Sequence, residues 1–238
     1  MPLPPLSRFL LLLPLSRRRR RLLLSTAAEA AAAPAPAPAP GRPTDPSLLL
    51  RLCTVLYQHQ HAPEDALRRR LSALPLPSAA ADDLRELFLQ ASARFPLSWR
   101  PVRRLLDHLT AAHGFAHSPA TAARFLDVLA KSRNVDLLHS TLLSFPPALR
   151  SLAALRAAIR GLAPAREVGK VSSLLALFPD ADRPRTLNFI TDVVCSVCKL
   201  PDVAEKVIKQ AEHRYGVSQT GRCCELLVVG YCPRGDAL

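Results

Sequence analysis

A short hydrophobic phrase recurs in the second half of this 238-residue chain at an almost constant spacing. Its four copies begin at Phe125, Ala158, Ile190 and Leu227. In each copy a small or β-branched residue stands just before the last apolar residues of the phrase. We call this residue the anchor of the copy, and the four anchors are Val128, Gly161, Val193 and Gly230. The anchors lie 33, 32 and 37 residues apart. A period of this length indicates stacked structural repeats rather than one closed core. Stacked repeats form long binding surfaces.

Each repeat unit has the pattern of a helical hairpin. A first helix ends at a short turn, a second helix follows, and a breaker such as Pro146-Pro147 closes the unit. The expected second helices span 135–143, 168–178 and 202–214. Leu and Ala are abundant and favour helix, and only 5% of the residues are aromatic. The sequence therefore predicts an all-α fold in which helical hairpins stack as an α-solenoid.

The region 46–118 is predicted to be helical but lacks the clear period. Helices are expected over 47–58, 64–73 and 82–94, the last capped by Asp82, and a fourth helix is expected to start at Pro101. These helices make either degenerate repeats or a cap. The repeats proper are expected over 119–238, as about three units and a partial fourth.

Residues 1–45 are expected to be a disordered organelle-targeting segment followed by a Pro/Ala linker. Of the formal net charge of +13, +6 lies in residues 1–44, which carry seven arginines and one glutamate. An Arg-rich, acid-poor segment is typical of organelle import. Few hydroxyl residues favour the mitochondrion, with the chloroplast as the alternative. A basic tail that contacts RNA non-specifically is the other interpretation. The apolar run at Leu10 is too short to span a bilayer.

The rest of the chain keeps a charge of +7. A basic excess of this kind favours a polyanionic partner such as nucleic acid. An ordinary solvated surface explains the same excess equally well.

The copies near the C-terminus resemble the pentatricopeptide repeat. Thr186-Leu-Asn-Phe-Ile-Thr-Asp-Val-Val-Cys, continued by Lys199-Leu-Pro-Asp-Val-Ala, is similar to the family phrase T-Y-N-T-L-I-D-G-L-C-K-x-G-x-x-D-E-A. Leu227-Val-Val-Gly-Tyr-Cys-Pro-Arg-Gly-Asp-Ala is closer still. The family is mainly plant organellar and binds single-stranded RNA. The resemblance is firm over 185–238 and extends with less detail over 120–184. The fourth unit stops after its first helix, as in a truncated product or a fragment of a longer array.

The resemblance also implies which residues would contact RNA, at about one base per unit. A residue of the first helix and the last residue of the unit read the base edge, and a neighbouring side chain sandwiches the base. The first-helix positions are Ala123, Arg156, Asn188 and Glu225. The last-residue positions are Ser151, Arg183 and Thr220, and the sandwiching positions are Ala120, Ala153, Arg185 and Arg222. Asn188 matches the family and suggests a pyrimidine. Arg156, Arg185 and Arg222 are expected to hold phosphate or stack on bases.

No catalytic, metal or cofactor site is predicted. Cys195-x-x-Cys198, with Cys223, Cys224 and Cys232, suggests zinc. However, Cys195 and Cys232 fall where the repeat phrase itself carries a small buried Cys. His113-x-x-x-His117 has helical ligand spacing, but Gly114 interrupts it and no third ligand is evident. The chain also has no phosphate-binding glycine loop and no serine elbow.

Two functions remain open on the sequence alone. The first is binding of organellar single-stranded RNA, in aid of processing, stability, editing or translation, with RNA-processing or ribosomal proteins as further partners. The second is a protein–protein adaptor in a mitochondrial complex such as the ribosome. A stripe of Arg156, Arg160, Arg185 and Arg222 along the concave face would favour RNA, and an apolar face would favour protein. A fragment with no function of its own is a third reading.

Overall fold

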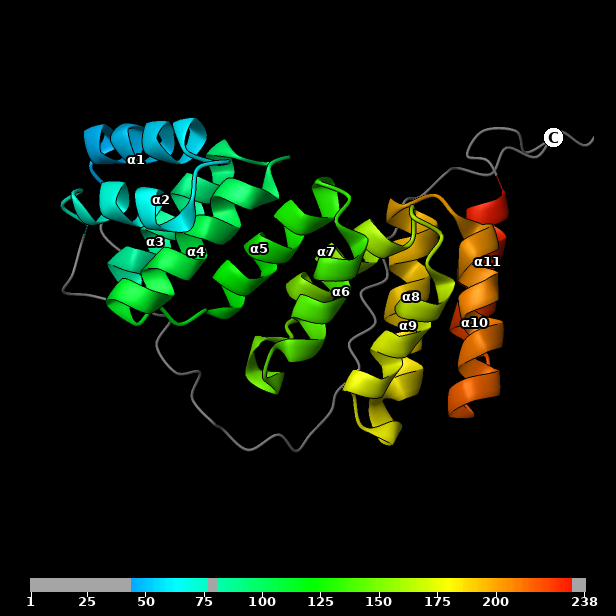
Figure 1. Cartoon of the computed structure of the whole chain (residues 1–238). Coiled ribbons are helices and arrows are strands. Elements are labelled where there is room, and N and C mark those ends of the chain that lie inside the picture. The colour runs from blue at the N-terminus through cyan, green and yellow to red at the C-terminus, as the bar shows by residue number, and fades with distance from the viewer. Residues whose placement is uncertain (1–43, 77–80, 233–238) are drawn as a thin grey trace, which may run out of the picture. The chain divides into compact units, whose positions relative to one another are not determined.

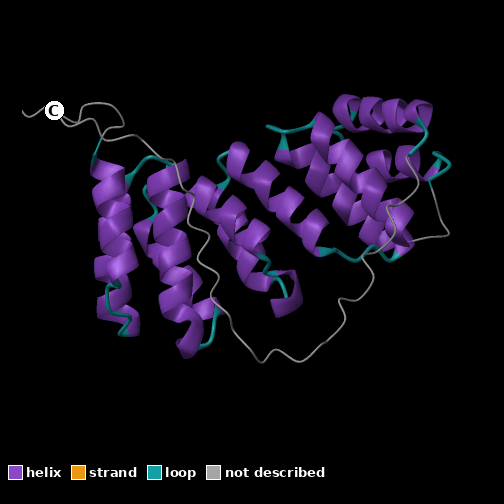
Figure 2. Ribbon diagram, turned by 180° about the vertical axis from the view of Figure 1, so that it is seen from behind, coloured by secondary structure: helices purple, strands orange, loops and turns teal. Residues whose placement is uncertain are grey.

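The computed structural model describes residues 44–76 and 81–232, which all lie in one compact unit of the chain (Figure 1). Residues 1–43 of the predicted targeting segment lie outside the described residues. The described ranges form eleven α-helices and contain no strand (Figure 2). The all-α prediction is therefore confirmed. None of the described helices is both long and apolar enough to cross a membrane.

The helices pair in chain order into antiparallel hairpins. The hairpins that precede the predicted repeats are α1 (Pro46–Gln58) with α2 (Glu64–Ser72) and α3 (Ala81–Arg94) with α4 (Trp99–His113). The next are α5 (Pro119–Lys131) with α6 (Val135–Ser144), α7 (Leu152–Leu162) with α8 (Val168–Ser173), and α9 (Arg183–Asp192) with α10 (Pro201–Tyr215). The last described helix is α11 (Gly221–Tyr231).

The first helices of successive hairpins pack side by side. α1 contacts α3, α3 contacts α5, and α5 contacts α7 most extensively. α7 then contacts the π-helical segment Val193–Val197 that continues α9, and α9 contacts α11. The hairpins therefore follow one another as an α-solenoid, as Figure 1 shows by the order of the colours. Helices α1 to α4 join the same row, although their sequence lacks the period.

Two of the four anchors, Gly161 and Gly230, lie where neighbouring helices approach closely. A Cβ atom on Gly161 would lie 2.5 Å from Leu138 Cδ2 and 2.8 Å from Ala130 Cβ. Real Cβ contacts are not this short, so α7 can pack on α5 only because Gly161 has no side chain. At Gly230 the space is larger, and a Cβ would lie 3.2 Å from Cys195 Cβ. The recurring small residue thus has a packing cause.

The turns of the three hairpins α5–α6, α7–α8 and α9–α10 share a left-handed backbone residue. Arg133, Arg166 and Lys199 have φ of 56°, 57° and 59°, and each stands two residues before its second helix. These turn residues recur every 33 residues. The anchor Val193, however, follows the anchor Gly161 after only 32 residues, so one more residue separates Val193 from its turn. The π-helical turn Val193–Val197 takes up this extra residue, since a π turn is how one inserted residue fits in a helix. The repeat therefore keeps its register across the insertion.

Three expected helix boundaries were wrong. The second helix expected over 168–178 ends at Ser173 and tightens into a 3₁₀ turn, because Phe178 precedes Pro179 and takes an extended conformation. The fourth helix starts at Trp99 with Ser98 at its N-cap, so Pro101 lies inside the first turn, where a backbone N–H has no partner to lose. Asp82 lies within α3 and does not cap it.

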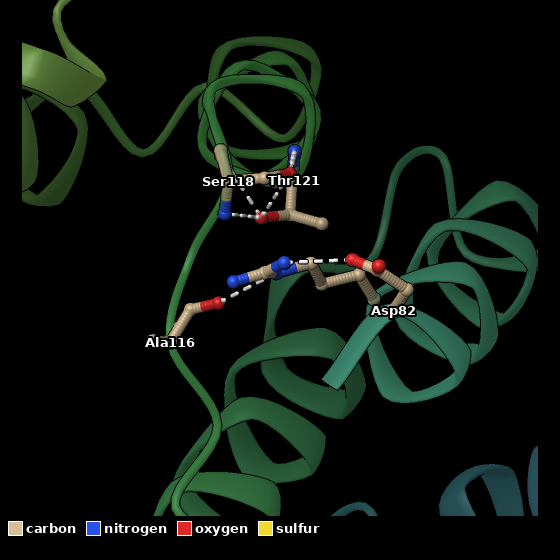
Figure 3. Close-up of polar contacts among 5 residues, drawn as sticks. Asp82, Ala116, Ser118 and Thr121 are labelled. Carbon is tan, nitrogen blue, oxygen red and sulfur yellow. Dashed lines mark hydrogen bonds and ion pairs between the residues drawn. The ribbon is translucent and has the colours of Figure 1, made fainter. Parts of the chain in front are cut away.

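Polar contacts fix the start of the predicted repeats, as Figure 3 shows. Ser118 and Thr121 form a reciprocal capping box at the N-terminus of α5. Arg85 of α3 pairs with Asp82 at 2.7 Å and donates to the carbonyl oxygen of Ala116 at 3.3 Å. These bonds tie α3 to the loop that leads into α5, so the first repeat is joined to the hairpin before it.

Candidate nucleic-acid interface

An open groove of about 640 Å³ runs across four successive first helices, α3, α5, α7 and α9. Its volume lies in the range of ligand sites. Side chains of Ala120, Ala123, Ala153 and Ala157 form part of its lining, together with Leu89, Leu152 and Phe189. The small alanines keep the groove open along α5 and α7.

The charge of the groove is strongly positive. Arg124, Lys131, Arg156 and Arg160 line it, against the single carboxylate of Asp127. Asp127 lies 2.6 Å from Lys131, 3.7 Å from Arg160 and 3.9 Å from Arg124. One carboxylate therefore gathers three cations from two neighbouring helices, and the groove keeps a net charge of +3.

Arg156 and Phe189 meet across the α7–α9 junction. The guanidinium carbon of Arg156 lies 5.7 Å from the centroid of the Phe189 ring, within the range of a cation–π contact. Arg156 is exposed and Phe189 is half-buried. In the described part of the chain no carboxylate lies within ion-pair distance of Arg156. Its charge is therefore available to a ligand.

Asn188 and Thr220, expected from the resemblance to read one base together, are brought into contact. The Thr220 hydroxyl donates to Asn188 Oδ1, and the Cys223 thiol donates to the same oxygen at 3.1 Å. Thr220 also caps α11 by accepting from the Cys223 N–H at 3.2 Å. No hydrogen-bond acceptor for the Asn188 amide nitrogen lies among the described residues. Asn188 therefore presents a free donor.

The remaining predicted positions differ in their surroundings. Arg185 is exposed near the start of α9, at the repeat position that Ala120 and Ala153 hold in the groove. Arg222 is exposed near the start of α11 and pairs with Glu225 at 2.9 Å. Because this pair neutralises its charge, Arg222 offers less to a polyanion than Arg185.

The last-residue positions fulfil a structural role. Ser151 caps α7 by accepting from the Ala154 N–H at 3.2 Å, as Thr220 does for α11. Arg183 behaves differently, since it pairs with Asp180 at 2.7 Å and lies 5.6 Å from the ring centroid of Tyr215. Ser151 and Arg183 therefore serve helix capping and packing.

Sequence reasoning overlooked four groove residues that the site uses, namely Arg124, Asp127, Lys131 and Phe189. Asp127 stands inside the first copy of the repeat phrase, at the position that Arg160 holds in the next copy. That charge reversal between equivalent positions was the available signal, because equivalent side chains of stacked repeats become neighbours. Phe189 carried no comparable signal.

The cysteines are spread over different surroundings. Cys195 is buried, and burial raises the pKa of its thiol to about 11, so it carries no thiolate at neutral pH. Cys232 is exposed rather than buried, which corrects the expectation, because no described element covers that side of α11. Within the described ranges no three His, Cys, Asp or Glu side chains are arranged as metal ligands.

His113 and His117 belong to separate clusters. α4 ends at His113, and Gly114 follows in the left-handed conformation. His113 packs against His108 with ring centroids 5.9 Å apart. His117 lies among four phenylalanine rings, whose centroids are 5.3 to 6.2 Å away and belong to Phe88, Phe115, Phe125 and Phe145. Burial there lowers the pKa of His117 to about 4, so its ring is neutral at pH 7.

Comparison with known proteins shows similarity to a curated plant protein. A pentatricopeptide repeat-containing protein of Arabidopsis thaliana is 30% identical over 203 residues. The alignment covers 82% of this chain and 38% of the relative, so the chain spans well under half the length of the curated protein it matches. No family model matches the chain. No solved structure matches it either.

Proposed function

The chain is a homologue of a plant pentatricopeptide repeat protein, as its sequence phrase predicted, and we propose that it binds single-stranded RNA through the groove of its first helices. Proteins of this family are generally helical-repeat RNA-binding proteins without catalytic activity. The observation that carries the proposal is the excess of four cations over one carboxylate along α5 and α7. Cations spaced along one face attract a phosphate backbone.

The site at Asn188 adds base recognition to this electrostatic binding. Its amide oxygen already accepts from Thr220 and Cys223, so only its amide nitrogen is left to meet a base. A lone donor pairs with an acceptor on a base edge, such as a pyrimidine carbonyl oxygen. Asn188 with Thr220 thus selects the base, while Lys131, Arg156 and Arg160 hold the strand. Arg185 extends the cationic face towards α9, and Arg222 contributes less at α11 because it pairs with Glu225.

The proposed place of action is an organelle, namely the mitochondrion. Plant proteins of this family are mostly organellar. The Arg-rich, acid-poor composition of residues 1–45 supports the mitochondrion, with the chloroplast as the alternative. Fusion of residues 1–45 to a fluorescent protein tests this part separately. Fluorescence confined to the cytosol would contradict it.

Binding of a labelled random-sequence single-stranded RNA to the full chain tests the RNA proposal. The variant Lys131→Gln/Arg156→Gln/Arg160→Gln is expected to bind about ten to a hundred times more weakly, and its salt dependence should have a slope smaller by about 2. The control variant Arg70→Gln/Lys206→Gln/Lys209→Gln makes the same charge change on exposed second-helix positions of α2 and α10.

Both variants retain residues 1–44, so any contribution of that basic segment cancels. The control is expected to lose less than the groove variant. If the two triple variants weakened binding equally, the groove would have no special part in RNA binding. If the parent chain bound no RNA, the proposal would fail altogether.

A protein adaptor is the second candidate function, and one observation favours it. Leu50 and Tyr57 of α1 are 69% and 67% exposed and line a groove with Leu49, Cys53 and Phe95. Exposed apolar grooves of this kind accept partner proteins. A partner that coprecipitates with the full chain after ribonuclease digestion, and that is lost with Leu50→Ser, would favour this function.

A further inference from the structure

At the α7–α9 junction, Arg156 stacks on Phe189, and recognition of a base edge does not require this contact. Arg156 takes the first-helix reading position of its repeat, where Asn188 stands in the next. Its guanidinium lies over the Phe189 ring, 5.7 Å from the ring centroid, instead of over a polar partner. Both side chains line the groove. Arginine at this position presents a planar cation, and Phe189 adds an aromatic ring beside it.

We propose that Arg156 and Phe189 form a stacking site for one unpaired RNA base, without preference for the identity of the base. This site rests on the proposed RNA-binding function and extends it. Every base has a π face, so stacking on an aromatic ring or a guanidinium tolerates any sequence. The α7–α9 junction thus holds a base by its face, while the Asn188–Thr220 pair at the next junction contacts a base edge.

Three observations distinguish this pair from a merely structural contact. First, Arg156 is exposed and has no carboxylate partner in the described part of the chain, whereas Arg183, stacked on Tyr215, pairs with Asp180 at 2.7 Å. Arg183 is largely buried, with 20% of its side chain exposed. No ion pair among the described residues therefore neutralises the charge of Arg156.

Second, the groove beside the pair has room for a base, since Ala153 and Ala157 line α7 there. Third, Lys131 and Arg160 line the same groove and can take the phosphates next to a stacked base. A flat aromatic surface, open space and nearby cations are the elements that single-strand binding sites combine.

The test measures binding of the full chain to two labelled RNA oligomers of equal length. One is oligouridine, and the other is an abasic ribose-phosphate oligomer, which has the phosphates but no bases. The variants are Phe189→Leu, which keeps an apolar side chain but removes the ring, and Arg156→Lys, which keeps the charge but removes the planar guanidinium. The control is Arg100→Lys, because Arg100 lies 5.6 Å from the Trp99 ring centroid on α4, away from the groove.

Both groove variants are expected to bind oligouridine about five to thirty times more weakly, because stacking on one base is lost. Binding of the abasic oligomer should not change. An oligomer of mixed bases should lose affinity by the same factor as oligouridine. Arg100→Lys should bind like the parent, and circular dichroism during heating verifies that each variant is folded.

Equal loss for both oligomers would show that the pair contacts phosphate only, and unchanged binding of oligouridine would show that it contacts no base. Either result refutes the stacking site and leaves the proposed function standing. If the parent chain bound neither oligomer, the proposed function would fail and the stacking site with it.

Discussion

The α5–α7 and α9–α11 junctions are built from the same repeat phrase but offer different chemistry. At α5–α7, Gly161 allows close packing, and the exposed residues are cations gathered around Asp127. At α9–α11, Gly230 leaves more space, and the notable contact is the polar pair Asn188–Thr220. The repeat thus determines how helices pack, while the variable exposed positions decide what each junction can bind.

The two junctions also differ in regularity. The α5 helix is continuous from Pro119 to Lys131, whereas α9 gives way to the π-helical turn Val193–Val197. The extra residue in that turn lies after Asn188, so it does not shift Asn188 relative to the start of α9. A repeat can therefore contain an inserted residue in its packed π-helical turn without a shift of its base-contacting position.

The largest effect is expected from the difference in packing. Gly161→Ala should lower the free energy of unfolding by about 3 kcal/mol, the upper part of the range for overpacking, because its Cβ would overlap Leu138 and Ala130. Gly230→Ala should cost less, since its nearest neighbour, Pro201 Cβ, is 3.1 Å away. Urea unfolding of both variants measures the difference.

Gly169→Ala is the matched control. Its nearest atom is 3.9 Å away, so the variant should be as stable as the parent or up to about 1 kcal/mol more stable. Equal stability of the Gly161 and Gly169 variants would contradict the close approach of α7 to α5.

The next largest effect is expected for the pH dependence of stability, through His117, which packs against Phe125 of α5. The folded pKa of His117, about 4, lies below its ordinary value near 6.5, so the unfolded chain binds the proton more readily between these two values. Stability should therefore fall as the pH drops from about 6.5 to 4, by about 2 kcal/mol after allowance for solvent screening of the partly exposed ring. Hydrogen exchange should show α5 losing protection before α11.

His117→Leu should remove this share of the pH dependence. Some dependence should persist, because burial also lowers the pKa of His108. If the parent and His117→Leu lost stability in parallel on acidification, His117 would not be buried as a neutral ring.

A smaller effect distinguishes residues that only cap a helix from residues that also contribute to base recognition. Thr220→Ala and Ser151→Ala each remove one N-cap bond and should each cost about 1 kcal/mol of stability. Only Thr220→Ala also releases Asn188, so only this variant should change which bases are enriched when a random RNA pool is selected on the chain. Thr220→Ser, which keeps the hydroxyl, should enrich the same bases as the parent. The same change of preference in Ser151→Ala would refute the assigned difference between the junctions.

The smallest effect concerns the cation at α11. Glu225→Gln should release Arg222 from its ion pair and raise RNA affinity about twofold to threefold, as expected for an exposed pair. Fluorescence anisotropy with a labelled single-stranded RNA measures this gain, which should disappear at high salt. Glu64→Gln, which frees Arg68 on α2 instead, is the control and should raise affinity less. An equal gain would mean that net charge alone acts.

The fold could be predicted well from the sequence because its main signals are local. Abundant Leu and Ala, the repeated hydrophobic phrase, and proline and glycine breaks indicate the hairpins from residues that are neighbours in the sequence. Helix ends were less predictable, because Phe178 before Pro179 ends one helix early and Pro101 is tolerated inside the first turn of the helix that starts at Trp99. The regular stacking of α1 to α4 was not predictable, since their packing residues do not keep the phrase.

The candidate site was predictable only in part. The resemblance to the pentatricopeptide repeat implied Asn188, Thr220 and Arg156, and repeat equivalence located the same positions in each hairpin. It did not give Asp127 or Phe189, whose importance depends on which residue of the next helix they meet.

The sequence by itself determined the all-α class, the 33-residue unit and which positions are equivalent, because helix propensity and hydrophobic period act along the chain. The tertiary structure alone decided which side chains meet. Asp127 contacts Arg160, Arg156 contacts Phe189, and Asn188 contacts Thr220 across intervals of 32 or 33 residues. The cause is physical: neighbouring repeats touch where their helices pack, and Gly161 and Gly230 let α7 approach the α5–α6 hairpin and α11 approach the α9–α10 hairpin closely.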